Sequence, residues 1–355
     1  MKVDVYYTKS DHLTRIMTGL HLLEKQGVLE CRYIEDKNHD VLPDSANMLE
    51  LRINDKRIAF DLRDASALNQ ERNWSYLTSV DAYFERSHTN WKNHAGIADQ
   101  AEKIYPFGFN YYMTYPGNPA FVPSSSKNYL KNILRNAINC SKYTRVEAFE
   151  GKADYDPPKK PRIIFMTRLW SPDEVKIPAD ASAEKKAYRE KMIEERRKIN
   201  ADRIEICRQL RNIYGSQFCG GIQSSSYAVK LCPDVILPSR MTMKQNYLKL
   251  MKGSDICIGS SGLEKSIGWK TGEYVAAARA IVCEELAYLL PGDFAAGKNY
   301  LSYHDVSSCL NAVDALCSDP QSIYDMQLAN EQYYREYLRP EKQILNALAQ
   351  CGIRL

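Results

Sequence analysis

The chain has 355 residues, of which 44% are hydrophobic and 26% charged, and its formal net charge is +4. This composition is typical of a globular protein, and the charge is too small to indicate a nucleic-acid partner. Because one domain commonly has about 100–200 residues, the length predicts two domains. The sequence has no apolar run of about 18 residues and no apolar core near its start, so we expect neither a membrane span nor a secretory signal. The expected location is therefore cytoplasmic.

The ten cysteines are scattered along the chain and form no CxxC pair. Most lie in apolar contexts, such as SDICIGS and AIVCEE, where cysteine behaves as a small buried hydrophobe. In a chain without an export signal, we interpret them as reduced thiols. A zinc site would need tighter ligand clusters, so we expect no metal.

The first half of the chain alternates between strand-like and helix-like segments. The strand-like segments are rich in β-branched and aromatic residues; they are residues 2–8, 29–34, 48–55, 56–64, 80–87 and 102–114. Helices are predicted over residues 10–27, with Ser10 or Asp11 as the cap, and over residues 127–139. A polar turn at residues 54–56 predicts that the third and fourth strands form a hairpin.

A proline-rich break at residues 151–162 separates the two halves. Two consecutive prolines and a third shortly after them resist both helix and sheet, so this segment is the predicted interdomain linker. The alternation then resumes. The further strand-like segments are 162–170, 215–222, 235–239, 255–262 and 280–283, and the helix-like ones are 184–211, 242–254, 268–279 and 308–319.

Strands that alternate with helices of about 10–15 residues imply parallel α/β units. We therefore expect an α/β fold with two Rossmann-like domains facing across a cleft, whose ligands lie beyond the carboxyl ends of the strands. The expected domains are residues 1–155 and residues 156–334.

The predicted helix at 184–211 is unusually rich in charge. One interpretation is a solvated helix face with ion pairs between successive turns. The other is a contact for anionic lipid or an anionic carrier, which would place the protein peripherally at the inner face of a membrane.

Three places in the second domain are expected to open onto one edge of its sheet. They are Arg168 after one strand, Ser260 and Ser261 after another, and the helix start at Gly268. Loop amides and a helix N-terminus attract anions, and a guanidinium adds a formal charge for phosphate. The sequence therefore predicts an anion site at this edge.

Lys270 and Glu273 stand one helical turn apart at the start of that helix. The ammonium suits a phosphate, and the carboxylate can accept two hydrogen bonds from a ribose diol, so the pair suits a nucleotide. Each residue also has a simpler explanation. The helix dipole alone favours Glu273 in the first turn, Lys270 could be a surface lysine, and Arg168 a structural ion-pair partner.

The stretch GWKTGEYVAAARAIVCEE, residues 268–285, resembles the K-x-x-E-Y-x-A-x-x-x-P-[IV]-[IV] signature of nucleotide-sugar glycosyltransferases with the GT-B fold. The similarity is good over about residues 250–340, weaker over 160–250, and only architectural over 1–150. The chain has Ala278-Arg279-Ala280 where the family usually has Gly-[KR]-Pro. Glu264 stands one residue too far from Glu273 for the E-x7-E spacing of many retaining members, so its role is not carried over.

The resemblance implies a ribose contact at Glu273 and diphosphate contacts at Lys270 and Arg168. It further implies transfer of a sugar from a nucleoside-diphosphate sugar, with basic side chains and helix N-termini rather than a metal stabilising the leaving group. No cofactor is expected. A DxD-like element at residues 154–156 lies in the linker and is interpreted as a solvated loop.

Asp11 and His12 are the candidate base of the first domain, because they directly follow the first strand, where inverting GT-B enzymes often place one. The alternative is that Asp11 only caps the helix and His12 lies on its exposed first turn. Other polar residues that follow strands are Asp64, Arg86 and His88.

The last part of the chain, with Tyr333, Tyr334, Tyr337 and Pro340, resembles the terminal GT-B segment that crosses back onto the first domain. This implies that about residues 335–355 pack on that domain, with a helix kinked at Pro340. The tyrosines are interpreted as packing between domains rather than as a substrate platform.

The expected activity is thus a metal-independent glycosyltransferase that acts on a hydroxyl of a glycan or lipid-linked acceptor, in surface polysaccharide assembly. Two alternatives remain on the same fold: a nucleotide-sugar 2-epimerase, and a non-catalytic subunit that binds a nucleotide sugar.

Overall fold

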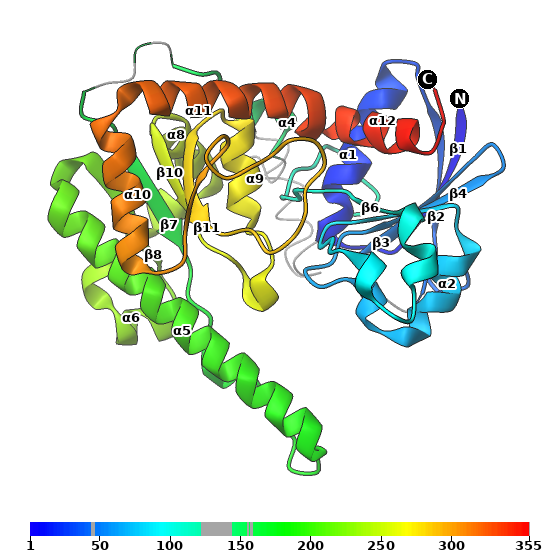
Figure 1. The fold of residues 1–355 in the computed structure, drawn as a ribbon, viewed down its shortest axis with the longest axis horizontal. Helices are drawn as coiled ribbons and strands as arrows, with labels where there is room; N and C mark the ends of the chain where they lie inside the picture. The colour runs from blue at the N-terminus through cyan, green and yellow to red at the C-terminus, as the bar shows by residue number, and fades with distance from the viewer. Residues whose placement is uncertain (44–46, 122–143, 155, 157–158, 355) are drawn as a thin grey trace. The chain divides into compact units, whose positions relative to one another are not determined.

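The computed structural model describes residues 1–43, 47–121, 144–154, 156 and 159–354, which form two compact α/β units (Figure 1). Unit 1 comprises Met1–Glu150, Ala287–Phe294 and Gln332–Leu355, and unit 2 comprises Gly151–Leu286 and Ala295–Glu331. The predicted helix at 127–139 lies outside the described residues. Within the described part of the chain, no helix is long and apolar enough to cross a membrane.

Unit 1 is built on a six-stranded sheet in the order β2-β1-β3-β4-β5-β6. The strands are β1 (Lys2–Tyr7), β2 (Glu30–Glu35), β3 (Met48–Ile53), β4 (Lys56–Asp61), β5 (Ala82–Glu85) and β6 (Ile104–Pro106). Only β3 runs antiparallel to its neighbours β1 and β4, while the other pairs are parallel. The predicted hairpin of β3 and β4 is confirmed, and Asn54 at its turn has a φ of 53°, which asparagine tolerates well. Consequently β1, β4 and β5 end at the same edge of the sheet.

The helices of unit 1 are α1 (Thr14–Lys25), α2 (Trp74–Ser79), α4 (Val146–Phe149) and α12 (Pro340–Gln350). Helix α12 lies beside α1 (Figure 1). The two backbones approach so closely at Gly19 that an added Cβ would lie 2.5 Å from the carbonyl oxygen of Pro340. The buried guanidinium of Arg15 donates to the side chain of Gln343 and to the carbonyl of Leu338. The end of the chain is therefore an integral part of the unit 1 core.

Unit 2 contains six parallel strands in the order β12-β11-β10-β7-β8-β9. They are β7 (Ile163–Thr167), β8 (Phe218–Gln223), β9 (Ile236–Leu237), β10 (Ile256–Gly259), β11 (Ala280–Glu284) and β12 (Leu301–Tyr303). Counted from the first strand of the unit, this is the order 3-2-1-4-5-6 of a dinucleotide-binding Rossmann sheet, confirming the prediction of parallel α/β units for this half.

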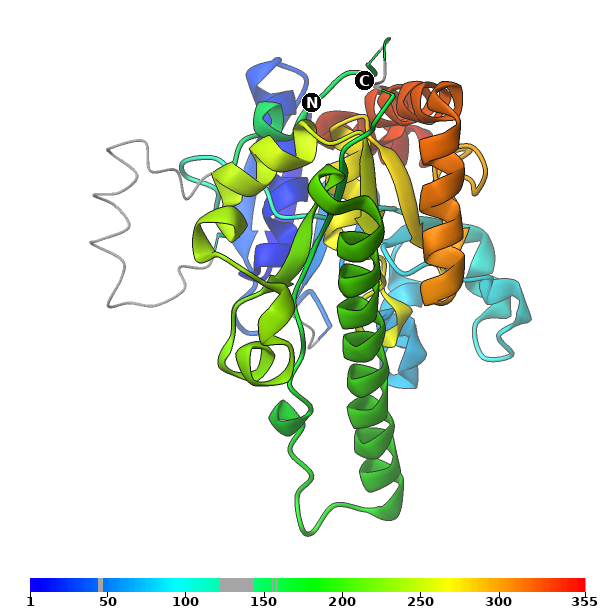
Figure 2. The same cartoon turned by 90° about the vertical axis from the view of Figure 1, so that its left-hand side faces the viewer.

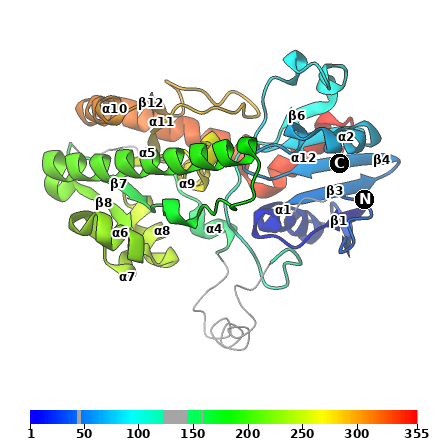
Figure 3. The ribbon, with the colours of Figure 1, turned by 90° about the horizontal axis from the view of Figure 1, so that it is seen from below.

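The helices of unit 2 are α5 (Ala183–Tyr214), α6 (Ser226–Leu231), α7 (Ser239–Thr242), α8 (Lys244–Lys252), α9 (Trp269–Ala276), α10 (Val306–Ser318) and α11 (Pro320–Tyr333), the last ending inside unit 1. Helix α5 packs along β8 and α10 with its carboxyl-terminal half, and its amino-terminal half extends beyond the sheet (Figures 2 and 3). Its buried residues, among them Arg203, Ile204 and Cys207, all lie between Asn200 and Leu210.

The chain passes between the units more often than the sequence suggested. The first residues of the predicted linker are fixed to unit 2, where the amide of Gly151 donates to Ala276 at 3.0 Å and that of Ala153 to Glu331 at 2.8 Å. Residues 287–294, between β11 and β12, belong to unit 1, although they fall within the predicted second domain of residues 156–334. Tyr333 anchors this segment by donating its hydroxyl to the carbonyl of Pro291 at 2.8 Å.

Candidate functional site

The sheet of unit 2 has a switch point between β7 and β10, where the strand order reverses. The two strands are parallel and pair through Ile163 and Ile256, so they end at the same edge. In open α/β sheets, ligands bind beyond the carboxyl ends of the strands at such a reversal. Arg168 directly follows β7 and Ser260 directly follows β10, so the structure brings both predicted site residues to this point.

Arg203 of α5 joins the two loops at the switch point. Its guanidinium donates to the hydroxyl of Ser260 at 3.0 Å, to the carbonyl of Arg168 at 2.7 Å and to the carbonyl of Ser261 at 2.9 Å. It also lies 4.3 Å from the ring centroid of Trp170. Burial lowers the pKa of Arg203 to about 10, and the nearby carboxylate of Glu284 opposes this shift. Arg203 thus fixes the shape of the loops while remaining charged at neutral pH.

Arg203 is not distinguished by its charge, because it lies within a run of charged residues that is typical of a solvated helix face. One signal was available. Arg203 stands next to Ile204 and four residues before Cys207, on the side of α5 that carries the apolar residues and is buried in the structure.

Gly268 allows α9 to begin against the end of β10. It is the N-cap of α9 and has an extended backbone, with φ −60° and ψ 136°. A Cβ at this position would lie 2.8 Å from the carbonyl oxygen of Ser260, so any larger residue would push the helix start away from the strand. Glycine therefore places the α9 N-terminus beside Ser260 and Ser261, as the sequence predicted.

Glu273 is a buried carboxylate with one oxygen unsatisfied. The residue is 4% exposed, and its Oε1 accepts a hydrogen bond from Nζ of Lys244 at 2.5 Å. Its Oε2 has no hydrogen-bond partner among the residues that the structure describes. Leaving a buried polar atom unpaired is costly, so this oxygen is suited to receive a hydrogen bond from a ligand.

Lys270 does not pair with Glu273, although it precedes this residue by one turn. Its ammonium lies 3.5 Å from the ring centroid of Tyr247, which is a cation–π contact. Burial lowers the pKa of Lys270 to about 8; Glu273 opposes this shift, and Lys244 reinforces it. Burial also raises the pKa of Tyr247, so its ring meets the lysine as a neutral phenol. The site thus holds a half-buried cation that contacts the ring of Tyr247 and makes no ion pair with Glu273.

The loop between β10 and α9 carries backbone strain. Glu264 and Lys265 have φ angles of 56° and 55°, a conformation that costs non-glycine residues about 1 kcal/mol each. Two residues of α5 hold this loop. Tyr188 donates to the carboxylate of Glu264 at 2.6 Å, and the Glu195 carboxylate accepts from the Glu264 amide at 2.8 Å.

The predicted base residues of unit 1 lie at the carboxyl end of β1. His12 shares a hydrogen bond of 2.9 Å between its Nδ1 and the carbonyl oxygen of Leu62, which follows β4. Because the carbonyl can only accept, Nδ1 carries the proton and Nε2 the lone pair. The helix cap is Ser10, which accepts from the His12 amide at 3.1 Å, and Asp11 is exposed. This arrangement suits His12 to act as a base, and Asp11 remains a second predicted candidate.

Two buried carboxylates lie at the same edge and were not singled out in the sequence. Asp61 ends β4, and Ala67 and Tyr83 donate to it at 2.6 and 3.2 Å; burial raises the pKa of this carboxyl. Glu85 ends β5, and its carboxylate lies 3.0 Å from Nδ1 of His88.

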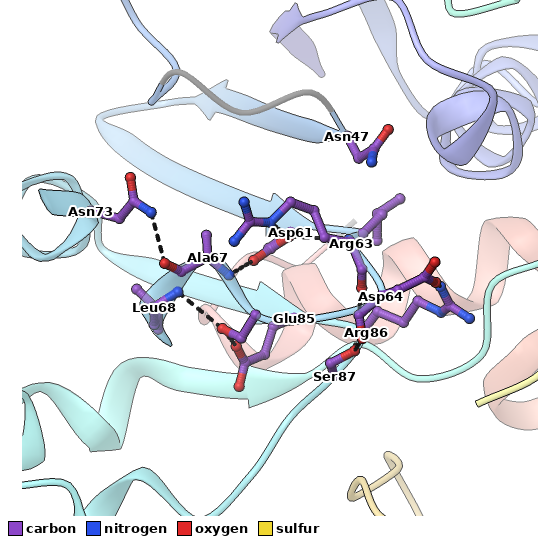
Figure 4. Close-up of polar contacts among 12 residues, drawn as sticks. Asn47, Asp61, Arg63, Asp64, Ala67, Leu68, Asn73, Glu85, Arg86 and Ser87 are labelled. Atoms are coloured by element: carbon purple, nitrogen blue, oxygen red, sulfur yellow. Dashed lines mark hydrogen bonds and ion pairs between the residues drawn. The ribbon is translucent and has the colours of Figure 1, made fainter. Parts of the chain in front are cut away.

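The polar residues around Asp61 are drawn in Figure 4, where the buried Arg86 reaches the exposed Asp64. Of the second-rank candidates, Asp64 and Arg86 therefore form an ion pair and His88 contacts Glu85. Because their partners are other groups of the protein, we assign these residues to the support of the loops after β4 and β5.

Comparisons with known proteins gave only distant similarities in structure, so the functional conclusion rests on the geometry of the site around Glu273. No protein-family model and no curated protein matches the sequence. Among solved structures, the chain is similar to Anabaena HepE in complex with UDP and glucose, with 10% identity, a TM-score of 0.45, and 98% of this chain and 99% of that chain covered. It is also similar to S. aureus MnaA with UDP, with 12% identity, a TM-score of 0.44, and 98% and 96% covered.

A third similarity is confined to part of the chain. The C-terminal domain of LpcC from Francisella tularensis, a glycosyl transferase group 1 family protein, shares 13% identity at a TM-score of 0.35, and the alignment covers 54% of this chain and 96% of that domain. Similarities of this strength do not assign the chain to a family or give it an activity.

Proposed function

We propose that the protein is a glycosyltransferase that uses a nucleoside-diphosphate sugar as its donor. The observation that carries this proposal is the Glu273 carboxylate, buried one turn after Lys270 at the switch point of a Rossmann sheet, with Oε2 unsatisfied. A carboxylate at this place can accept hydrogen bonds from a ribose diol, and a cation next to a helix N-terminus can bind a diphosphate.

Each predicted residue then has a role in donor binding. Glu273 accepts from the ribose hydroxyls, and the ammonium of Lys270 meets the diphosphate. Arg168 is exposed at the end of β7 and supplies a second cation. Gly268, Ser260 and Ser261 shape the amide-lined start of α9.

The chemical step transfers the sugar to an acceptor hydroxyl. The acceptor oxygen forms a bond to the anomeric carbon while the bond from that carbon to the diphosphate oxygen breaks. The nucleoside diphosphate leaves with the electron pair, and its growing negative charge is stabilised by Lys270, Arg168 and the α9 N-terminus. Nε2 of His12 takes the proton of the acceptor hydroxyl. This scheme needs no metal or cofactor.

The acceptor is proposed to be a hydroxyl of a glycan or lipid-linked glycan, in surface polysaccharide assembly by a cytoplasmic enzyme. This part of the proposal is carried by the sequence resemblance alone.

The protruding half of α5 is the surface that would meet a lipid-linked acceptor at the membrane. Tyr188 on it is 50% exposed among lysines and arginines, and Ile177 before it is 38% exposed. Co-sedimentation with vesicles that contain anionic lipid would test this contact.

A thermal-shift screen with UDP, GDP, TDP and CMP and their sugars tests the donor assignment. A ligand present at about 100 times its dissociation constant adds about 2.7 kcal/mol to the free energy of unfolding, which is readily measured. Absence of any shift with all four nucleotides would reject the proposal.

Incubation with the donor alone then separates transfer from epimerisation, because only an epimerase turns over without an acceptor. A subunit that only binds would show the shift but no turnover with any acceptor.

A further inference from the structure

Trp170 lies at the switch point of unit 2, in the loop that follows β7. The side chain of Asn200, in α5, fixes the backbone at this position. The amide of Trp170 donates to Oδ1 of Asn200 at 3.0 Å, and Nδ2 of Asn200 donates to the carbonyl of Trp170 at 2.7 Å. Asn200 is buried, so water competes little for these two hydrogen bonds. The backbone that carries the indole ring is therefore held by the same helix that supplies Arg203.

Two guanidinium groups lie near the Trp170 ring. The guanidinium carbon of Arg203 is 4.3 Å from the ring centroid and that of Arg168 is 5.4 Å from it, both within the range of a cation–π contact. Arg203 is buried, and its guanidinium donates to the switch-point loops. Arg168 is exposed, and among the described residues its side chain makes no hydrogen bond and no ion pair. Of the two, Arg168 is therefore the cation that can turn its donors to a ligand.

A cation–π contact holds a guanidinium without occupying its hydrogen-bond donors. The attraction acts between the charge and the face of the ring, whereas the five N–H groups can still donate to an anion. An ion pair with a carboxylate would instead occupy these donors and offset the charge. Contact with the ring also restricts the rotamers of Arg168 before a ligand arrives, so less side-chain entropy is lost on binding. Trp170 thus prepares Arg168 for an anion.

The surroundings of the ring favour a ligand with more than one negative charge. Burial lowers the pKa of Arg203 to about 10, and the charge of Arg168 adds to this shift. Burial likewise lowers the pKa of Lys270, and the charge of Arg203 adds to that shift. The three cations are thus close enough to repel one another, and a diphosphate between or beside them would relieve this repulsion.

We propose that Trp170 is a positioning residue, which holds the guanidinium of Arg168 at the switch point so that its N–H groups bind the diphosphate of the donor. The inference rests on the proposed function, because this diphosphate belongs to the proposed nucleoside-diphosphate sugar. Trp170 itself makes no contact with the diphosphate in this scheme. Its effect on binding therefore depends on the presence of Arg168.

The test is a double-mutant cycle, measured by isothermal titration calorimetry with UDP, GDP and TDP as probes. Trp170→Leu is made in wild type and in the variant Arg168→Met. When one residue acts through another, its replacement has no further effect once the other has been replaced. Trp170→Met is the second variant without a ring, and Trp170→Phe is the conservative variant that keeps an aromatic face. Thermal unfolding without ligand shows which variants are folded.

We expect Trp170→Leu and Trp170→Met to weaken binding of the nucleoside diphosphate about two- to fivefold, which corresponds to the loss of an exposed cation–π contact. In the Arg168→Met background the same changes should have no effect. Trp170→Phe should bind nearly as tightly as wild type.

An equal loss of affinity in both backgrounds would overturn the inference, because Trp170 would then act through Arg203 or through the fold of the loop. No loss in either background would also overturn it. These outcomes leave the proposed function standing, whereas failure of the wild type to bind any of the three probes would reject both.

Discussion

The carboxylate of Glu273 pairs with Lys244 of α8, and not with Lys270, which stands one turn before it in the same helix. Oppositely charged residues three positions apart on a helix are close enough to form an ion pair. The structure instead places Lys270 on the ring of Tyr247, so the cation and the carboxylate of the motif remain two separate binding groups. This separation is what a ligand with a phosphate at one end and a diol at the other requires.

Nucleotide binding is expected to weaken as the pH rises above about 8. Burial lowers the pKa of Lys270 to about 8 in the ligand-free protein; the carboxylate of Glu273 opposes this shift, and the charges of Lys244 and Arg203 reinforce it. A bound diphosphate favours the charged ammonium, so the pKa of Lys270 is higher in the complex. Below pH 8 Lys270 carries its proton in both states, so its own contribution to the affinity is constant. Above pH 8 binding must take up a proton, and the association constant falls by up to tenfold per pH unit.

Calorimetric titrations between pH 6.5 and pH 9.5 measure this dependence. The variant Lys270→Arg is the control, because an arginine stays charged throughout this range. Its affinity should not decline above pH 8. A wild-type affinity that is constant up to pH 9.5 would show that Lys270 does not contact the diphosphate.

Replacement of Arg203 is expected to damage both stability and binding. Arg203→Met leaves the hydroxyl of Ser260 and two loop carbonyls without their donor, so it should lower the free energy of unfolding by about 3 kcal/mol. Arg203→Lys keeps the charge but cannot donate to three acceptors in a plane, and should recover only part of this loss. Urea unfolding measures the stability. A variant as stable as wild type would contradict the assignment of Arg203 as the residue that positions the switch-point loops.

Much of the fold could be predicted because burial leaves a clear pattern in the sequence. Strands such as β7, β10 and β11 are short apolar runs bounded by polar or glycine residues, and each was expected where it is observed. The polar turn at residues 54–56 predicted the β3–β4 hairpin, because asparagine readily adopts the positive φ that Asn54 has there.

The polar partners of the site could not be predicted in this way. Lys244 and Glu273 are 29 positions apart, and Arg203 reaches Ser260 across 57 positions. Both basic residues lie on helices rich in lysine or arginine; the apolar side of α5 indicates that Arg203 is buried, but the sequence does not indicate which groups either residue contacts. The placement of residues 287–294 in unit 1 could not be predicted either, because contacts between segments that are distant in the sequence determine it.

Loss of His12 is expected to stop transfer without affecting the donor. His12→Ala removes the Nε2 lone pair and leaves the residues of unit 2 unchanged, so kcat should fall by at least about a hundredfold while the affinity for the nucleotide stays as in wild type. Asp11→Ala, one position away and exposed, is the control and should retain most of the activity. Full activity of His12→Ala would remove the proposed base.

The central claim, that Glu273 binds the ribose of a nucleotide, is tested most directly by calorimetry with a ribonucleoside diphosphate and its 2′-deoxy analogue, on wild type and on Glu273→Gln. Loss of a hydrogen bond to a charged group weakens binding by about 1.5–3 kcal/mol, so wild type should prefer the ribonucleotide by at least about tenfold. Glu273→Gln should bind both ligands with nearly equal affinity. An undiminished preference for the ribonucleotide in Glu273→Gln would contradict the account.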